Sequence, residues 1–170
     1  MKHHFFLLAL AMTLSNAVFG AGNGTGSASS SNEQSPKESE SMKIKLTIKD
    51  RVLTATLENN KTAQDFVSLL PLTLTMDDLF GQEKFGHLPR AISEAGERTD
   101  RYEVGQIVYW SPGPDVAIFY RNDQKAIPDP GIIVIGRLDS GAEALDVDGS
   151  VKVTIEVANR SSNDSFQGCL

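Results

Sequence analysis

The stretch that decides the fold is VGQIVYWSPGPDVAIFY, residues 104–120. It contains two apolar runs, 106–110 and 116–120, separated by a Pro-Gly-Pro-Asp segment of the kind that forms a turn. Neither run has a polar face, so both strands of the predicted hairpin need cover on two sides. An open sheet with one face in water would expose one of these faces, whereas a closed barrel has an interior and can carry cover outside it. The stretch therefore favours a barrel.

Several other segments have the pattern of β-strands. Apolar and polar residues alternate in residues 43–49, 52–57, 72–76 and 151–157. The first two segments are separated only by Asp50-Arg51, which predicts a hairpin with one buried face. Residues 132–138 form an almost entirely apolar strand, in which Gly136 indicates a β-bulge.

Two short helices are expected between the strands. Thr62 is a suitable N-cap, and Asp65 three residues later can support the same helix start. Residues at i, i+3, i+4 and i+7 give this helix an apolar face, and Pro71 ends it. That face consists of Ala63, Phe66, Val67 and Leu70. Residues 140–143 match a capping box and predict the second helix.

These elements predict a mainly β fold, a closed β-barrel of about eight strands with two short capping helices, over residues 42–158. Between the strands, residues 77–100 have no clear pattern except a short strand around 87–92. A loop of that length inside a compact domain is usually functional or disordered. This segment is therefore a candidate for the functional site.

The two ends of the chain differ in composition from the predicted domain. Residues 1–20 have the basic start, the apolar run and the small residues of a secretory signal peptide. The alternative is a membrane anchor, but the apolar run is about half of the roughly 20 residues that a span requires. Residues 21–41 resemble a flexible Gly/Ser-rich linker, and 159–170 a C-terminal tail. We expect an exported protein, periplasmic or secreted, with no membrane span after cleavage.

Charge and cysteine content narrow the classes of partner. The formal net charge is −6, and no basic cluster is present, which argues against a nucleic-acid partner. Cys169 is the only cysteine, so the protein has no internal disulfide, and the thiol is either exposed or bridges two molecules. The sequence leaves the oligomeric state open.

Four segments together resemble a known family. They are TLENNKTAQDFVSLLPLTLTM (56–76), GQEKFGHLP (81–89), AIFYRN (117–122) and IGRLDSG (135–141). In order and spacing they are similar to the bacterial cyclophilin-like fold family, across nearly all of 42–158. The resemblance implies a minimal cyclophilin barrel with a helix after the first hairpin and another near the end. It implies little about function, because this family is largely uncharacterised.

Cyclophilins themselves isomerise X-Pro peptide bonds, and they do so with an arginine that donates toward the prolyl nitrogen above an apolar pocket. The Phe-His-Arg run that carries this arginine in cyclophilins does not occur here. The nearest candidates are Arg90, Arg101 and Arg121, and none fits the motif. Peptidyl-prolyl isomerase activity with a non-standard site is therefore the alternative function rather than the first.

The residues argue against several other chemistries. His87 is the only histidine after the predicted signal peptide, so no histidine cluster can bind a metal. No Gly-x-Ser-x-Gly elbow, dinucleotide fingerprint or phosphate loop is present. We expect no catalytic residues, no metal and no cofactor.

What remains is a non-enzymatic module that binds a peptide or a small ligand with apolar and anionic parts. The aromatic hairpin and the loop that follows residue 81 supply the apolar contacts, one imidazole and the guanidinium donors. The predicted ligand-binding residues are Phe85, His87, Arg90, Arg101, Tyr109 and Phe119.

Overall fold

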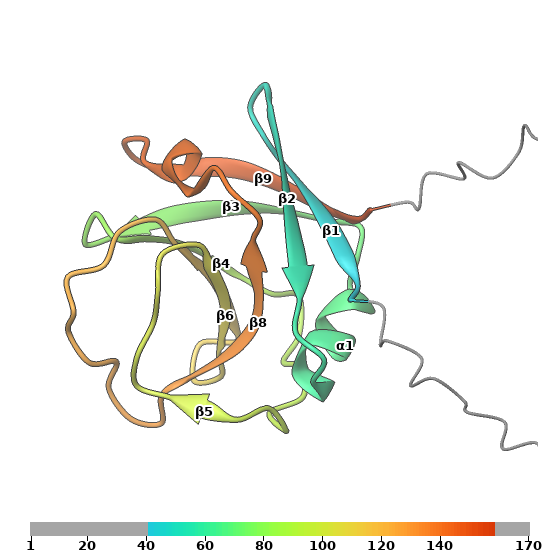
Figure 1. The fold of residues 1–170 in the computed structure, drawn as a ribbon, viewed down its shortest axis with the longest axis vertical. Helices are drawn as coiled ribbons and strands as arrows, with labels where there is room; N and C mark the ends of the chain where they lie inside the picture. Colours follow the sequence, from blue (N-terminus) through green and yellow to red (C-terminus); the bar gives the residue numbers. More distant parts are fainter. Residues whose placement is uncertain (1–40, 159–170) are drawn as a thin grey trace, which may run out of the picture. The chain divides into compact units, whose positions relative to one another are not determined.

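The computed structural model describes residues 41–158, which form the barrel in Figure 1. The predicted signal peptide (1–20), the predicted tail (159–170) and Cys169 lie outside these residues, as does all of the predicted linker except Ser41. Within the described part of the chain, no helix has the length and hydrophobicity that crossing a membrane requires.

Nine strands and two short helices make up this part of the chain. The strands are β1 (Lys43–Ile48), β2 (Arg51–Leu57), β3 (Leu72–Leu79), β4 (Glu83–His87), β5 (Arg98–Thr99), β6 (Gln106–Trp110), β7 (Asp115–Phe119), β8 (Ile132–Leu138) and β9 (Val151–Val157). The helices are the α-helix α1 (Lys61–Val67) and the 3-10 helix η1 (Ala142–Leu145).

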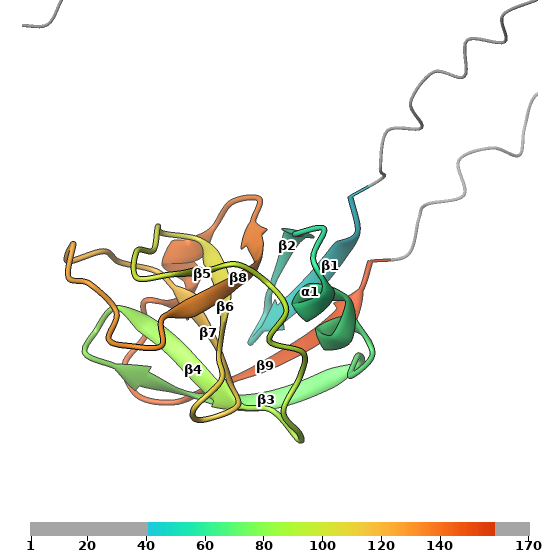
Figure 2. The same cartoon turned by 90° about the horizontal axis from the view of Figure 1, so that it is seen from below.

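Eight of the strands form a closed antiparallel barrel. Their order is β2-β1-β9-β3-β4-β7-β6-β8, and β8 pairs with β2 to close the ring. The ninth, β5, pairs with the start of β8 (Figure 2). The prediction of a closed barrel of about eight strands is confirmed. Both ends of the described chain leave from neighbouring strands, because β1 pairs with β9 and Ala158 N donates to Lys43 O at 2.9 Å.

The hairpin β6–β7 is buried on both faces, as its two apolar runs predicted. Its inward residues belong to the main core inside the barrel, which includes Ile107, Tyr109, Val116 and Ile118. Its outward residues belong to a second apolar cluster outside the barrel. That cluster contains Tyr102, Val108, Ala117, Phe119 and Ile132. The outer face of this hairpin is therefore covered by chain rather than by water.

Gly136 lies where the barrel closes. The pairing of β6 with β8 shifts register between Ile107 and Val108, beside Gly136, so the predicted bulge is confirmed. A Cβ at Gly136 would lie 2.9 Å from Leu57 Cδ2 and 3.0 Å from Thr56 O. Only glycine lets β8 approach β2 this closely.

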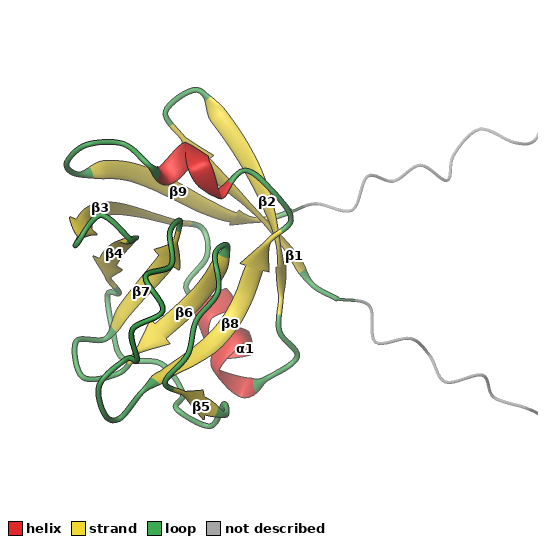
Figure 3. Cartoon of the chain, turned by 60° about the vertical axis from the view of Figure 1, so that its left-hand side comes forward, coloured by secondary structure: helices red, strands yellow, loops and turns green. Residues whose placement is uncertain are grey.

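The helices differ in detail from the prediction, and they lie at opposite ends of the barrel (Figure 3). Asn60, and not Thr62, caps α1, because its Oδ1 accepts from Ala63 N at 2.8 Å. The second helix is a single 3-10 turn, and the predicted capping box is wrong. The N-cap of η1 is Gly141 at φ 83°, which has no side chain to bond with.

The prediction that residues 77–100 are irregular is wrong in its first part. Strand β3 continues to Leu79, and β4 spans Glu83–His87 instead of residues around 87–92. The reason is that the inward positions of β4 are Lys84 and Gly86, which are both buried. A lysine and a glycine do not produce the apolar alternation by which a strand is recognised.

Candidate functional site

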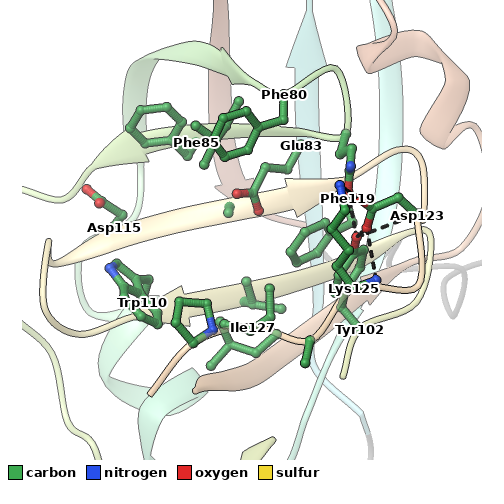
Figure 4. A pocket seen from close by; sticks show the side chains of 17 residues that line it. Phe80, Glu83, Phe85, Tyr102, Trp110, Asp115, Phe119, Asp123, Lys125 and Ile127 are labelled. Carbon is green, nitrogen blue, oxygen red and sulfur yellow. Dashed lines mark hydrogen bonds and ion pairs between the residues drawn. The ribbon is translucent and has the colours of Figure 1, made fainter. Parts of the chain in front are cut away.

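A pocket of about 560 Å³ lies on the outer face of the barrel, over β4, β7 and β6 (Figure 4). The segment between β7 and β8 forms its opposite wall. The lining residues are Leu79, Phe80, Gln82, Glu83, Phe85, Tyr102, Val108, Trp110, Asp115, Ala117, Phe119, Asp123, Lys125, Ala126, Ile127, Pro128 and Ile132. The pocket is thus outside the barrel, and the barrel interior is filled by the main core.

Strand register sets the floor of the pocket. Alternate residues of a strand point to one face, so the outward residues of β4 are Glu83, Phe85 and His87. Across the β4–β7 pairing they lie opposite Phe119, Ala117 and Asp115, respectively. The register therefore places a carboxylate at each end of this floor, with an apolar centre between them.

Aromatic rings form most of the apolar wall. Phe119 stacks on Tyr102 with ring centroids 3.9 Å apart and an interplanar angle of 18°. Trp110 and Phe85 continue this wall along the sheet, and both are partly buried. Phe80, in the turn before β4, is 87% exposed at the rim. Exposed aromatic side chains beside a concave surface are typical of binding sites.

A hydrogen-bonded network holds one end of the pocket. Tyr102 Oη lies 2.5 Å from Gln82 Oε1 and 2.8 Å from Asp123 Oδ1. Lys125 Nζ lies 2.7 Å from Asp123 Oδ2, and this hydrogen bond is the main cause that lowers the pKa of the Asp123 carboxyl. Among residues 41–158, Lys125 is the only Lys or Arg that lines the pocket, and its charge is paired with that of Asp123.

The β7–β8 segment is held by two hydrogen bonds to the segment between β5 and β6. Asn122 Nδ2 donates to Tyr102 O at 2.8 Å, and Ile127 N donates to Asp100 O at 2.8 Å. These bonds place Ile127 beside the second apolar cluster. The wall that faces the sheet is therefore apolar in its middle.

Asp115 and His87 form the opposite end of the floor. Asp115 is buried, and its Oδ1 is in ion-pair contact with Nδ1 of His87, although the two groups make no aligned hydrogen bond. Burial raises the pKa of Asp115, and the charge of His87 opposes this rise. The His87 side chain is 74% exposed and packs edge-on against Phe85, 6.0 Å between ring centroids.

Glu83 is the one carboxylate of the lining without a partner in the described chain. Its side chain extends from β4 into the cavity, toward the wall that carries Ile127 (Figure 4). No hydrogen bond or ion pair involves its carboxyl group among residues 41–158. Burial, together with the charges of Asp115 and Asp78, raises the pKa of Glu83 to about 7. Near neutral pH this group can accept or donate a proton or a hydrogen bond.

The structure brings some of the predicted site residues together and separates others. Phe85 and Phe119 line the pocket, and His87 adjoins it through Asp115. The remaining three lie outside the lining: Arg90, Arg101 and Tyr109.

Each of these three has other contacts. Arg90 Nη2 lies 2.7 Å from Asp65 Oδ1 and 2.8 Å from Ser68 Oγ. The hydrogen bond from Arg90 is the main cause that lowers the pKa of Asp65 to about 2. Arg101 lies on the surface, with Asp100 beside it. Tyr109 is 0% exposed in the main core, where its hydroxyl accepts from Ile92 N. Asp65 therefore holds Arg90 and does not cap α1.

Sequence reasoning missed Glu83, Trp110, Tyr102 and Lys125. Glu83 was missed because β4 was placed too late in the chain. The signal that the sequence offers is the alternation Glu83-x-Phe85-x-His87, which puts these three side chains on one face of a strand. For the opposite wall of the pocket, the signal in the sequence is the apolar Ala-Ile-Pro run at 126–128 within a polar loop.

Comparison with protein families matches residues 46–156, more than half of the chain, to the cyclophilin-like family. The chain belongs to the cyclophilin-like family. Among solved structures, the fold is similar to the solution structure of the hypothetical protein AF2241 from Archaeoglobus fulgidus. The TM-score is 0.57 and the sequence identity 21%, over 69% of this chain and 95% of that one. No curated protein matches the chain.

At this identity the likeness shows a shared fold alone. Within residues 41–158, no group of three or more His, Cys, Asp or Glu side chains is placed to hold a metal ion. The site must therefore be argued from its own geometry.

Proposed function

We propose that this cyclophilin-like domain is a non-enzymatic module that binds a small, largely apolar ligand in the outer-face pocket. The observation that supports this most is the cavity of about 560 Å³ walled by Phe85, Trp110, Phe119 and Ile127. Ligand pockets typically have about 300–1,000 Å³, mostly apolar walls and a few polar groups that orient the ligand. The pocket on β4, β7 and β6 has all three properties.

The charges of the lining change the ligand that we expect. An anionic ligand held by Arg90 or Arg101 was the expectation from sequence. Arg90 is engaged by Asp65 and Ser68, and neither arginine belongs to the lining. The apolar body of the ligand is therefore the part that this proposal retains.

Prolyl isomerisation is the competing function, and the family membership alone motivates it. Lowering the roughly 18–20 kcal/mol barrier requires a donor that weakens the amide resonance. Among the described residues, no arginine lines the pocket, and its only lysine is paired with Asp123. We expect exchange spectroscopy on X-Pro peptides to give the uncatalysed rate, and catalysis would contradict the non-enzymatic proposal.

We further propose that the domain acts outside the cytoplasm, because residues 1–20 have the pattern of a secretory signal peptide. The N-terminal residue of the purified mature protein tests this. Cleavage near residue 20 and recovery from the periplasm or medium are expected. An intact N-terminus in the cytoplasmic fraction would contradict the location but not the binding proposal.

Binding itself is tested by titrating the full chain with phenylbutanol, a neutral probe with an apolar body, while amide shifts are recorded by NMR. We expect shifts at Val108, Ala117 and Phe119. Ala117→Leu adds bulk inside the pocket and should weaken binding about tenfold. The control Val157→Leu adds bulk on β9, outside the lining, and should leave the affinity unchanged. Absence of shifts at these amides would contradict the proposal.

A further inference from the structure

We propose that the pocket selects ligands that carry an ammonium group on an apolar body, and that Glu83 is the residue that pairs with this group. The inference rests on the proposed function, since it requires that the pocket bind a ligand at all. It adds the chemical class of the ligand and the residue that determines the specificity.

The first support is the charge of the lining. Three carboxylates line the pocket, Glu83, Asp115 and Asp123, against one lysine. Lys125 Nζ lies 2.7 Å from Asp123 Oδ2, so the charges of these two side chains cancel. Asp115 is in contact with His87. The lining therefore carries an excess of negative charge, and Glu83 is the group left to pair with a cation.

The second support is the position of Glu83. Its carboxyl group extends into a cavity whose walls are apolar on both sides, and no protein donor among residues 41–158 bonds to it (Figure 4). A partly buried carboxylate without a partner is costly, and a ligand cation removes that cost. An anionic or purely apolar ligand would bury this carboxylate and leave it unpaired.

The third support is the set of aromatic rings that line the same pocket as Glu83. Phe85, Trp110 and Phe119 all line the pocket, and Phe80 stands at its rim. Ring faces attract cations that have lost part of their hydration, and alkylammonium groups are bound in this way in aromatic cages. The rings can therefore hold the apolar body and also favour the positive charge beside it.

The pH dependence follows from the groups that face Glu83. Those that share its cavity are Gln82 after β3, Asp115 on β7, and Asp123 with Lys125 on the β7–β8 segment. The charge of Asp78, whose carboxyl group is bonded to Lys84, also acts on Glu83. His87, farther along β4, faces Asp115. Burial and the charges of Asp115 and Asp78 raise the pKa of Glu83 to about 7. A cation binds the ionised form, so affinity for an amine should rise with pH from about 5.5 to 8 by tenfold or more.

The test is a calorimetric titration of the full chain with three probes that share one apolar body: phenylbutylamine, phenylbutanol and phenylbutanoate. At about pH 8 we expect the amine to bind about tenfold more tightly than the alcohol, and the carboxylate most weakly. In Glu83→Gln the amine and the alcohol should bind equally, and the rise of amine affinity with pH should disappear.

The control variant is Glu156→Gln, which removes the same charge from β9, where Glu156 pairs with Lys45 outside the lining. It should keep the preference for the amine. His87→Asn removes the imidazole beside Asp115, and the rise of amine affinity with pH should persist in this variant. Thermal melts check that each variant is folded before titration.

The outcomes separate the inference from the proposed function. Equal affinity for the amine and the alcohol in the unmodified chain would overturn the inference and leave the binding proposal intact. A preference for the amine that survives in Glu83→Gln would overturn the assignment to Glu83. If none of the three probes binds, the proposed function itself is overturned.

Discussion

Glu83 and Lys84 are consecutive residues of β4, and their charged groups have opposite surroundings. Lys84 points into the barrel and is 0% exposed. Its Nζ donates to Asp78 Oδ2 at 2.8 Å, Val147 O at 2.5 Å and Gly149 O at 2.7 Å. Glu83 points outward into the pocket and has no partner among residues 41–158. All three donors of the ammonium are used, whereas the carboxylate uses none of its acceptor sites.

The carboxyl groups of Asp78 and Glu83 differ in the same way, because Asp78 has several hydrogen-bond donors around it. Its carboxyl group accepts from Lys84, from the hydroxyl of Tyr120 and from Gly81 N at 2.8 Å. The hydrogen bond from Lys84 is the largest cause that lowers the pKa of Asp78 to about 2. In Glu83 the pKa shifts the opposite way, to about 7. A charge with a full set of partners serves the fold, and one with none is available to a ligand.

The largest effect is expected from breaking the inner network. Lys84→Met should lower the free energy of unfolding by about 3–5 kcal/mol, because it removes the buried ammonium that donates to Asp78 and to two carbonyl groups. Urea denaturation at neutral pH measures this. The matched control is Lys45→Met, whose ammonium is half exposed beside Glu156 and should matter by at most about 1 kcal/mol. Similar losses in both variants would remove the contrast.

The second prediction concerns Glu83 and has the opposite sign. Because its pKa is raised from 4.5 to about 7, the folded state holds this proton more tightly than the unfolded chain. Its favourable contribution is complete below about pH 4.5 and is lost as the pH rises through 7. Glu83→Gln should therefore stabilise the domain by about 3 kcal/mol at pH 8 and by a few tenths at pH 4.5. Denaturation curves at the two pH values check this, and a loss of stability at pH 8 would contradict it.

A smaller effect is expected at Tyr120. Tyr120→Phe removes one of the donors to Asp78 and keeps Lys84 and Gly81 N. The loss should be about 1 kcal/mol, the usual value of a hydrogen bond to a group that retains other partners. Thermal or chemical denaturation measures it. A loss as large as that of Lys84→Met would mean that the hydroxyl, rather than the ammonium, holds the network.

The smallest effect is expected at Arg90. Arg90→Ala breaks a solvent-exposed ion pair with Asp65, which should change the stability only slightly. Because Arg90 does not line the pocket, the affinity for phenylbutylamine should not change. Calorimetry on this variant checks that point. A clear loss of affinity would mean that Arg90 contributes to ligand binding, as the sequence predicted.

Most of the barrel was predictable because the outer surfaces of β1, β2 and β9 face water and their inner surfaces are apolar. That difference appears as alternation in the sequence. Strand β4 was not predictable in this way, since its inward residues are Lys84 and Gly86. Two of the groups that satisfy Lys84, the carbonyls of Val147 and Gly149, come from a distant part of the chain. The residues around Lys84 in the sequence therefore give no indication of these two carbonyl groups.

The site was predictable to the extent that residue type decides it. Phe85 and Phe119 were named because aromatic side chains supply apolar contact wherever they are exposed to a cavity. Tyr109 was predicted for the same reason, but its position in β6 points its side chain into the barrel core. Glu83 is distinguished because no donor among residues 41–158 bonds to its carboxyl group. This can be seen only in the folded structure, and not in the sequence. Arg90 shows the reverse case, because Asp65 engages its charge.

The pairing of β1 with β9 has a consequence for how the domain can be connected. In the order of the sheet, these two strands lie across the ring from β6 and β7, which form the floor of the pocket. The polypeptide therefore enters and leaves on the side opposite to the pocket floor. A fusion partner or a host loop joined at residues 41 and 158 meets the domain at its back, so this barrel can be grafted, immobilised or displayed with its pocket facing outward.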